Sequence, residues 1–330
     1  MNKIVVLGAG GWGLALALTA FDAGQDVTVW SPFEEEVNNL LKARENPKLL
    51  PGIKIPEAIK ITTDLSVVNG AYITITAVPS TAVRATASKL KGLDCGIIVN
   101  VAKGIESGTN LRLSEVIREE TGSEKIVVLS GPSHAEEVSR KIPTTVVAAS
   151  NDPQLSDAVQ QVLTTIYFRI YTNDDVAGVE LGGALKNVIA VAAGIADGLH
   201  LGDNTKAALI TRGLFEMSRL GVKMGAKENT FSGLSGLGDL VVTCTSEHSR
   251  NHRFGKMLGL GETPEKALSA VGTVEGYYAC RTVKKLSELY GVEMPICDGC
   301  YEIIFNGKNA DETLKKLMSR PNRDEREKLL

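Results

Sequence analysis

A glycine-rich turn near the N-terminus constrains the fold of this chain more than any other feature of its sequence. Gly8, Gly10 and Gly13 form the pattern G-x-G-x-x-G, between the apolar run of residues 3–7 and a helical stretch at residues 14–23. In this context the first glycine permits a tight turn, the second lets the backbone approach a pyrophosphate, and the third lets the helix pack closely on the strand. Free N–H groups at the start of the helix then face the phosphates. The pattern therefore predicts a dinucleotide-binding unit.

Strand-like and helical stretches alternate through the first half of the chain. Because most of the predicted strands are apolar along their whole length, helices should cover both faces of their sheet. These features predict an α/β fold that begins with a Rossmann-type, doubly wound sheet. Strands are expected at residues 3–7, 26–30, 72–78, 96–102, 125–130, 144–150 and 167–172, with helices at 83–91, 110–121 and 153–164 between most of them.

The second half of the chain is mainly helical. We expect a dinucleotide-binding domain at residues 1–178 and a helical substrate and catalytic domain at residues 179–330. No low-complexity linker separates them, so they should pack closely, and the charged stretch at residues 319–330 reads as a solvated tail. The expected helices are 177–199, 205–222, 251–260, 263–270, 276–290, 296–306 and 310–318.

Composition excludes several classes of protein. The chain has 330 residues, 43% of them hydrophobic, and a net charge of −3, which gives no overall attraction for nucleic acid or an anionic membrane. No apolar run reaches the length of a membrane span, and no secretory signal precedes the first strand. Five scattered cysteines argue against a disulfide framework. We therefore expect a cytoplasmic, globular protein.

Polar residues follow three of the predicted strands, at residues 77–80, 102–106 and 130–137. Ligands of open α/β sheets bind beyond the carboxyl ends of the strands. Topology therefore predicts that Lys103 and Ser133 face the same crevice as the glycine-rich turn. The alternative for Lys103 is an ordinary loop lysine.

Lys186 interrupts an otherwise apolar helical stretch, "GGALKNVIAVAAG" at residues 182–194. Lysine is almost never fully buried without a partner. Small residues surround it at helical spacing, so a substrate or another backbone could approach closely. The alternative is a lysine that snorkels out of a packed helix pair. The small neighbours are Gly182, Gly183, Ala190 and Gly194.

A third polar stretch contains Asp239, Thr243 and the run Ser249-Arg250-Asn251. A carboxylate beside Lys186 could orient its ammonium group. An arginine at the start of a helix suits a phosphate, because guanidinium binds phosphate bidentately and the helix N–H groups add donors.

Two further patterns are weaker. His248 and His252 lie four residues apart, but arginines between and beside them would repel a metal, so no metal site is predicted. Cys297 and Cys300 form a lone C-x-x-C, which indicates two packed thiols rather than a redox centre.

The sequence resembles the bacterial NAD(P)-dependent sn-glycerol-3-phosphate dehydrogenases over nearly its full length. The resemblance implies reversible reduction of dihydroxyacetone phosphate to sn-glycerol 3-phosphate, which supplies the phospholipid backbone, by a homodimer that uses NAD or NADP. The motifs that carry it, in the family's order, are "GAGGWG", "VAKGIE", "SGPSHAEE", "GVELGGALKNVIAVAAGIADGL", "LITRGLFEMSRLG", "GLGDLVVTCTSEHSRNHRFG" and "TVEGY".

The resemblance also implies roles for individual residues. The family's catalytic lysine falls on Lys186 and its second active-site lysine on Lys103, and Asp239 would orient Lys186. Substrate-binding positions fall on Lys103, Gly131, Ser133, Lys186, Asn187, Asp239, Thr243, Ser249, Arg250 and Asn251. Cofactor contacts fall on Gly11, Trp12, Lys103, Ala135, Arg250, Thr273 and Glu275, in addition to Gly8, Gly10 and Gly13.

The expected chemistry explains the cation on the apolar helix. Hydride delivery to a ketone leaves negative charge on the oxygen, so the reaction needs a positioned acid, and Lys186 can give that proton. Desolvation between the domains and repulsion from Lys103 should lower the pKa of Lys186, while Asp239 opposes that shift. The glycines beside Lys186 would make room for the substrate.

Two other functions remain as alternatives. A related two-domain hydroxy-acid or ketoacid dehydrogenase, such as a ketopantoate reductase, would want a carboxylate clamp, whereas the Ser-Arg-Asn run suits a phosphate better. A non-catalytic dinucleotide-sensing protein would lack a proton donor, whereas Lys186, Lys103 and Asp239 are all present.

The choice between NAD and NADP should depend on the end of the second strand. Many members of the family carry a basic residue two positions after the tryptophan, where this chain has Pro32, and no Lys or Arg occurs from residue 4 to residue 41. Glu34, Glu35 and Glu36 add negative charge nearby, although the alternative is that they only begin the next helix and face water. We expect NADH to be accepted at least as well as NADPH.

Overall fold

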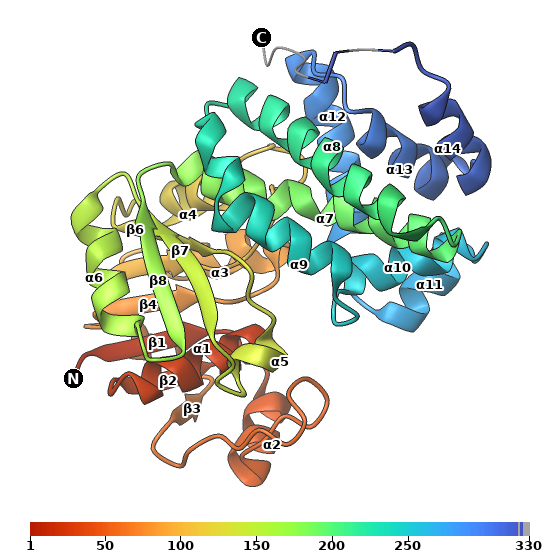
Figure 1. The fold of residues 1–330 in the computed structure, drawn as a ribbon. Helices are drawn as coiled ribbons and strands as arrows, with labels where there is room; N and C mark the ends of the chain where they lie inside the picture. Colours follow the sequence, from red (N-terminus) through yellow and green to blue (C-terminus); the bar gives the residue numbers. More distant parts are fainter. Residues whose placement is uncertain (323, 326–330) are drawn as a thin grey trace. The chain divides into compact units, whose positions relative to one another are not determined.

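The computed structural model describes residues 1–322, 324 and 325 (Figure 1). The chain divides into two compact units, one ending at Val176 and the other beginning at Ala177. Each unit has its own layers of secondary structure and is described separately.

The first unit is built on an eight-stranded sheet with the order β3-β2-β1-β4-β5-β6-β7-β8 (Figure 1). From β3 to β6 all neighbouring strands are parallel. The chain builds outward from β1 to β3, then returns to the other side of β1 with β4, so the order reverses between β1 and β4. The strands are β1 (Lys3–Leu7), β2 (Asp26–Trp30), β3 (Lys60–Thr62), β4 (Ile73–Thr76), β5 (Ile97–Asn100), β6 (Ile126–Ser130), β7 (Thr144–Ala149) and β8 (Phe168–Asn173).

Helices cover both faces of this sheet, and the predicted doubly wound architecture is confirmed. Successive residues of β1 divide between the faces: Val6 packs in the apolar cluster of Leu14, and Leu7 packs in the other cluster, with Val116. A fully apolar strand is therefore needed here, because neither face meets water. The helices are α1 (Gly11–Asp22), α2 (Glu34–Ala43), α3 (Val83–Ser88), α4 (Leu113–Thr121), α5 (Ala135–Val138) and α6 (Pro153–Leu163).

Strand β7 runs antiparallel to β6, which the sequence pattern did not indicate. The segment that joins them, residues 131–143, contains only the four-residue helix α5. A parallel connection usually needs a longer crossover helix, such as α6, which joins β7 to β8 in parallel. Strand β8 lies at the edge and alternates between buried and exposed side chains, as expected where one face meets water.

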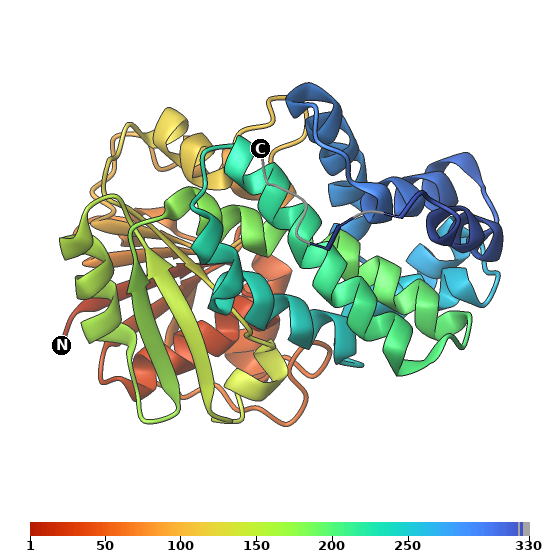
Figure 2. The same ribbon diagram turned by 45° about the horizontal axis from the view of Figure 1, so that its top comes forward.

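The second unit is helical, as predicted, and its core is α7 (Val176–Gly198). The long helices α7 and α8 lie side by side (Figures 1 and 2). Helix α7 is long and apolar enough to cross a membrane, but its most apolar window is wholly buried in the protein. A core helix passes the same test, so this is weak evidence for a membrane span. The other helices are α8 (Gly202–Lys223), α9 (Asp239–Thr245), α10 (Arg250–Gly259), α11 (Pro264–Val271), α12 (Glu275–Tyr290), α13 (Pro295–Asn306) and α14 (Ala310–Met318).

Glycines on α7 are approached by backbone. A Cβ atom added to Gly194 would lie 2.1 Å from the carbonyl oxygen of His252 on α10, and one added to Gly182 would lie 2.7 Å from that of Ser235. At these two positions the small residues near Lys186 therefore admit neighbouring backbone. The expectation that they make room for a substrate is wrong there.

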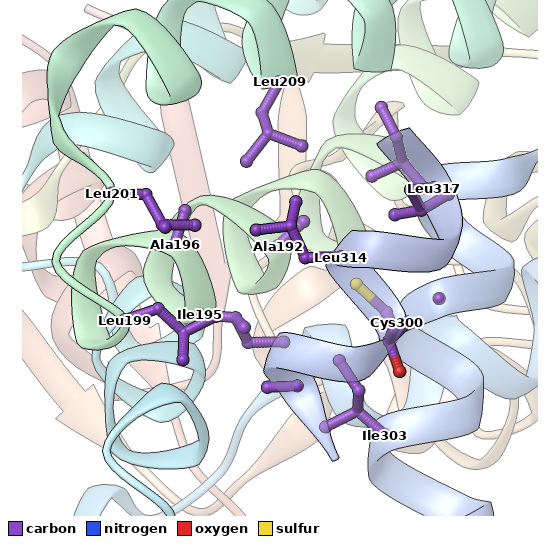
Figure 3. A pocket seen from close by; sticks show the side chains of 14 residues that line it. Ala192, Ile195, Ala196, Leu199, Leu201, Leu209, Cys300, Ile303, Leu314 and Leu317 are labelled. Carbon is purple, nitrogen blue, oxygen red and sulfur yellow. The ribbon is translucent and has the colours of Figure 1, made fainter. Parts of the chain in front are cut away.

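An apolar pocket lies among α7, α8, α13 and α14 (Figure 3). Its lining is almost entirely aliphatic and includes Ile195 and Leu209. The Cys300 thiol lies beside it, and Cys297 and Cys300 are both buried and free, as the reading of two packed thiols expected.

Candidate active site

The glycine-rich turn between β1 and α1 depends on the absence of side chains. Gly8 has a φ of +118°, and a Cβ atom there would lie 2.7 Å from the carbonyl oxygen of Ala77. A Cβ atom on Gly13 would lie 2.1 Å from the carbonyl oxygen of Gly8, so α1 starts in direct contact with the turn. Among the residues that the structure describes, no atom lies within 4 Å of a Cβ atom placed on Gly10. The backbone is therefore accessible at Gly10.

The first turn of α1 suits the pyrophosphate of a dinucleotide. Its N-cap, Gly10, offers no side-chain hydrogen bond, and no acidic residue occurs in the first turn. Backbone N–H groups at such a helix start, together with the helix dipole, favour an anion. A Cβ atom on Gly11 would lie 3.7 Å from the Cβ of Ala135, so these two expected cofactor residues are neighbours.

A second cluster lies where β5 and β6 end. These strands are parallel to β1 and β4, so their carboxyl ends share one edge of the sheet. Lys103 Nζ donates a hydrogen bond to the carbonyl oxygen of Gly131 at 3.1 Å, and Ser133 Oγ donates to the same oxygen at 3.0 Å. The structure therefore brings Lys103 and Ser133 together at the carbonyl oxygen of Gly131. That they share a crevice with the glycine-rich turn stays a prediction.

Lys186 is buried among polar partners of its own unit. Its side chain is 6% exposed, and Nζ donates to Asp239 Oδ1 at 2.5 Å and to Thr243 Oγ1 at 2.6 Å. Asp239 begins α9, and Thr243 follows one turn later on the same face, where its hydroxyl donates to the carbonyl oxygen of Asp239. The alternative of a snorkelling lysine is wrong, because the ammonium group is held inside the protein.

A chain of amide contacts joins three helices next to this ion pair. Asn187 Nδ2 donates to Glu275 Oε2 at 3.1 Å, and Asn251 Nδ2 donates to Asn187 Oδ1 at 2.9 Å. The backbone N–H of Gly276 donates to Asn251 Oδ1 at 2.8 Å. The two asparagines therefore fix α7, α10 and α12 to one another, a role that the sequence did not suggest.

The start of α10 carries the expected phosphate-binding run. Ser249 is the N-cap, and its hydroxyl oxygen accepts a hydrogen bond from the backbone N–H of His252. Arg250 is the first residue of the helix and its side chain is exposed. Thr273 lies in the loop before α12 and is also exposed.

His252 has a structural role that the sequence pattern did not indicate. It is 1% exposed, and its Nε2 lies 2.7 Å from Asp197 Oδ2, which also accepts from Lys206 Nζ at 2.9 Å. These contacts anchor α10 to α7 and α8. In the sequence, the position of His252 three residues after the N-cap serine was the feature that could have indicated its burial on α10. In the part of the chain that the structure describes, no three His, Cys, Asp or Glu side chains form a metal-binding group.

The acidic run after β2 is only partly directed to water. Helix α2 begins at Glu34, and Glu34 and Glu35 are exposed. Glu36 instead accepts a hydrogen bond from the hydroxyl group of Ser31, which is buried. For Glu36 the alternative of a side chain that simply faces water is therefore wrong.

Both halves of the chain match models of one known protein family. Residues 3–156 match the N-terminal model, and residues 175–315 the C-terminal model, of NAD-dependent glycerol-3-phosphate dehydrogenase. The chain is 49% identical to a glycerol-3-phosphate dehydrogenase [NAD(P)+] of Clostridium perfringens, over 98% of this chain and 99% of that one. A similar enzyme of Desulfitobacterium hafniense is also 49% identical, over 100% of this chain and 94% of its own length.

The same family appears among solved structures. The crystal structure of glycerol-3-phosphate dehydrogenase from Coxiella burnetii superposes with a TM-score of 0.91 at 40% identity, covering 97% of this chain and 99% of that one. The two family models together cover both units of the chain, and the relatives span both units. The chain belongs to the NAD-dependent glycerol-3-phosphate dehydrogenase family.

Proposed function

We propose that the protein reversibly reduces dihydroxyacetone phosphate to sn-glycerol 3-phosphate with NADH or NADPH. The observation that carries this proposal is the buried group of Lys186, Asp239 and Thr243, in a chain that matches the family over both units. A buried cation needs partners to remain charged, and here both partners also fix its direction. Such a group suits proton transfer to a ketone oxygen.

The first unit would hold the cofactor. Backbone N–H groups of the first turn of α1 would bind the pyrophosphate, with Gly10 leaving space for it. When bound, the nicotinamide supplies a hydride in reduction and accepts one in oxidation. The proposed cofactor contacts in this unit are Gly8, Gly10, Gly11, Trp12, Gly13, Lys103 and Ala135.

Lys186 would act as the general acid in reduction and as the general base in oxidation. As negative charge develops on the ketone oxygen, its Nζ gives up a proton, and the reverse reaction returns it. Asp239 and Thr243 hold Nζ in place, so the proton leaves in a defined direction. We propose Lys103 as the second active-site lysine, as the family resemblance implies.

Arg250 would bind the substrate phosphate. It lies at the start of α10, where its guanidinium group and the first N–H groups of the helix can bind one anion together. We propose that Ser133, Gly131 and Asn251 complete the substrate site, with Asn187 and Ser249, and that Thr273 and Glu275 contact the cofactor. Residues 1–178 would then be the dinucleotide-binding domain and residues 179–330 the substrate and catalytic domain.

The product is the backbone of glycerophospholipids, so we assign the protein to their synthesis. We also propose that it works in the cytoplasm as a homodimer, without nucleic acid or a membrane span. The family resemblance and the net charge of −3 support this assignment.

One assay separates this function from its rivals. Oxidation of NADH is followed with dihydroxyacetone phosphate, with a ketoacid such as ketopantoate, and without substrate. We expect NADH to be oxidised only in the assay that contains dihydroxyacetone phosphate. Equal rates with the ketoacid would instead indicate a hydroxy-acid dehydrogenase, and NADH binding without turnover on any substrate would indicate a dinucleotide sensor.

A further inference from the structure

A single carboxylate is fixed at the carboxyl end of β2. Ser31 follows the strand directly and is 1% exposed, and its hydroxyl group donates to Glu36 Oε2 on α2. The same hydroxyl oxygen accepts from the backbone N–H of Phe33 at 3.3 Å. Ser31 thus closes the turn between β2 and α2 and holds the side chain of Glu36 against it. Glu35, in contrast, is exposed.

This carboxylate lies next to the proposed dinucleotide site. The backbone N–H of Gly8 donates to the carbonyl oxygen of Trp30 at 2.8 Å, so the glycine-rich turn is bonded to the last residue of β2. Ser31 is the next residue along the chain. In a dinucleotide-binding sheet whose pyrophosphate lies at the start of α1, the adenosine ribose lies near the end of the second strand. Glu36 is therefore held close to the expected position of that ribose.

The basic residues nearest to Glu36 along the chain are Lys42 and Arg44. The sequence has no Lys or Arg from residue 4 to residue 41. Arg44, which follows α2, donates to the carbonyl oxygen of Ile59 at 2.8 Å and pairs with Glu57 at 3.1 Å. Its guanidinium group is thus used to hold the loop after α2. Lys42 lies six residues beyond Glu36, about 9 Å along the helix axis.

We propose that Glu36, held by Ser31, selects NADH over NADPH. Its carboxylate accepts a hydrogen bond from the ribose 2′-hydroxyl group of NADH and repels the 2′-phosphate of NADPH. The inference rests on the proposed function, because it concerns the cofactor of that reaction. We call Glu36 the selector. It belongs to the first turn of α2, and Ser31, which directly follows β2, holds its carboxylate in position.

Direct binding of the two cofactors tests the assignment. Dissociation constants for NADH and NADPH are measured by nucleotide fluorescence in the absence of substrate, at fixed ionic strength. We expect Glu36→Gln to shift the ratio of the two constants toward NADPH by about tenfold or more, equal to 1.4 kcal/mol. Gln keeps an oxygen that can accept from Ser31, so the turn should persist.

Glu35→Gln is the matched control, since it removes the same charge one residue away from an exposed position. We expect it to change the ratio by less than about twofold, because exposed charges are screened by salt. Ser31→Ala keeps the charge and releases the carboxylate, and should weaken NADH binding severalfold. Equal shifts in Glu35→Gln and Glu36→Gln, or no shift in Glu36→Gln, would overturn the assignment.

The experiments distinguish failure of the cofactor assignment to Glu36 from failure of the proposed reaction. If wild-type protein binds NADH and Glu36→Gln changes the ratio, but dihydroxyacetone phosphate is not reduced, the selector stands and the proposed reaction is wrong. If the reaction proceeds and the ratio is unchanged, the reaction stands and the selector is wrong.

Discussion

At the scale of single residues, Lys186 shows how burial and function are linked. Its ammonium group and the Asp239 carboxylate are both buried, at 6% and 2% side-chain exposure. Each charge is tolerable only because the other is present, since an unpaired buried charge is far more costly than a paired one. A substitution at Lys186 should therefore affect both the reaction and the stability of the second unit.

We expect Lys186→Met to lower kcat by roughly 10²–10⁴-fold, because the proton donor is removed. It should also lower the free energy of unfolding by about 3–5 kcal/mol, because Asp239 remains buried without its cation. The double variant Lys186→Met/Asp239→Asn should recover much of the stability and none of the activity. Urea unfolding and initial rates measure both effects, and a single variant that keeps more than about a tenth of wild-type kcat would remove Lys186 from the acid role.

Arg250 provides a second test, directed at the substrate phosphate. We expect Arg250→Lys to lower kcat/KM for dihydroxyacetone phosphate by about tenfold or more, because a point charge does not replace a bidentate guanidinium group. The loss should be small for unphosphorylated dihydroxyacetone, a poor substrate throughout. Equal losses on both substrates would contradict the assignment, and the KM of the cofactor is measured alongside because Arg250 is also a proposed cofactor contact.

At the scale of elements, the helices of the second unit differ in how closely they approach one another. On α10, a Cβ atom at Gly255 would lie 2.1 Å from the carbonyl oxygen of Val191 on α7. On α13, beside the apolar pocket, a Cβ atom at Gly299 would meet side-chain atoms, at 3.3 Å from Thr313 and 3.4 Å from Leu317. Close backbone contact therefore requires glycine at position 255. At position 299 the neighbours are side chains, which can move to admit a methyl group.

Alanine substitutions at these two glycines should have opposite effects. Gly299→Ala should raise the free energy of unfolding by about 0.5–1 kcal/mol, because alanine loses less backbone entropy in a helix. Gly255→Ala gains the same helix propensity but should destabilise by about 1–3 kcal/mol through the clash. Thermal unfolding of both variants measures the difference, and similar melting temperatures for the two would contradict this view of the α7–α10 contact.

The start of α13 depends on a buried acid from α8. Glu216 accepts hydrogen bonds from the backbone N–H groups of Ile296 at 2.8 Å and Cys297 at 3.2 Å. Burial raises the pKa of Glu216 to about 7, outweighing these two donors, which favour the charged form. The folded protein therefore binds this proton more tightly than the unfolded chain does.

The contribution of Glu216 to stability should consequently fall as pH rises. It is fully present below the ordinary glutamate pKa of about 4.3 and is lost as pH increases through about 7, because ionisation then opposes folding. Urea unfolding of the wild-type protein and of Glu216→Gln is compared between pH 5 and pH 8. We expect the wild-type protein to lose stability relative to the variant over this range, and a constant difference would show that Glu216 does not titrate there.

At the scale of the whole molecule, the proposed homodimer predicts the mass in solution. The chain has a mass of 35.2 kDa, so light scattering after size-exclusion chromatography should give about twice that value. A single species at the mass of one chain, across the concentrations used for assays, would rule out the dimer. The expected mass does not depend on the cofactor that the enzyme prefers.

Much of the fold could be predicted from local patterns. The apolar strands around Gly8 and the long helix that contains Lys186 are visible in sequence because their side chains repeat with the period of the element. Strand β3, at Lys60–Thr62, is too short to carry such a pattern, and α5 is a single turn. The residue types of the candidate site were also visible, as a lysine, a carboxylate and an arginine in characteristic runs.

Sequence patterns were enough to predict the glycine-rich turn, the sheet with helices on both faces, the helical second half and the family. The packed structure was needed to show that β7 reverses direction, that Thr243 joins the expected partner Asp239 at Lys186, and that Ser31 holds Glu36. The reason is the distance along the chain over which each kind of interaction acts. Periodicity and turn chemistry act over a few residues, whereas Lys186 and Asp239 are 53 positions apart, and their contact exists only once α7 and α9 have packed in the same core.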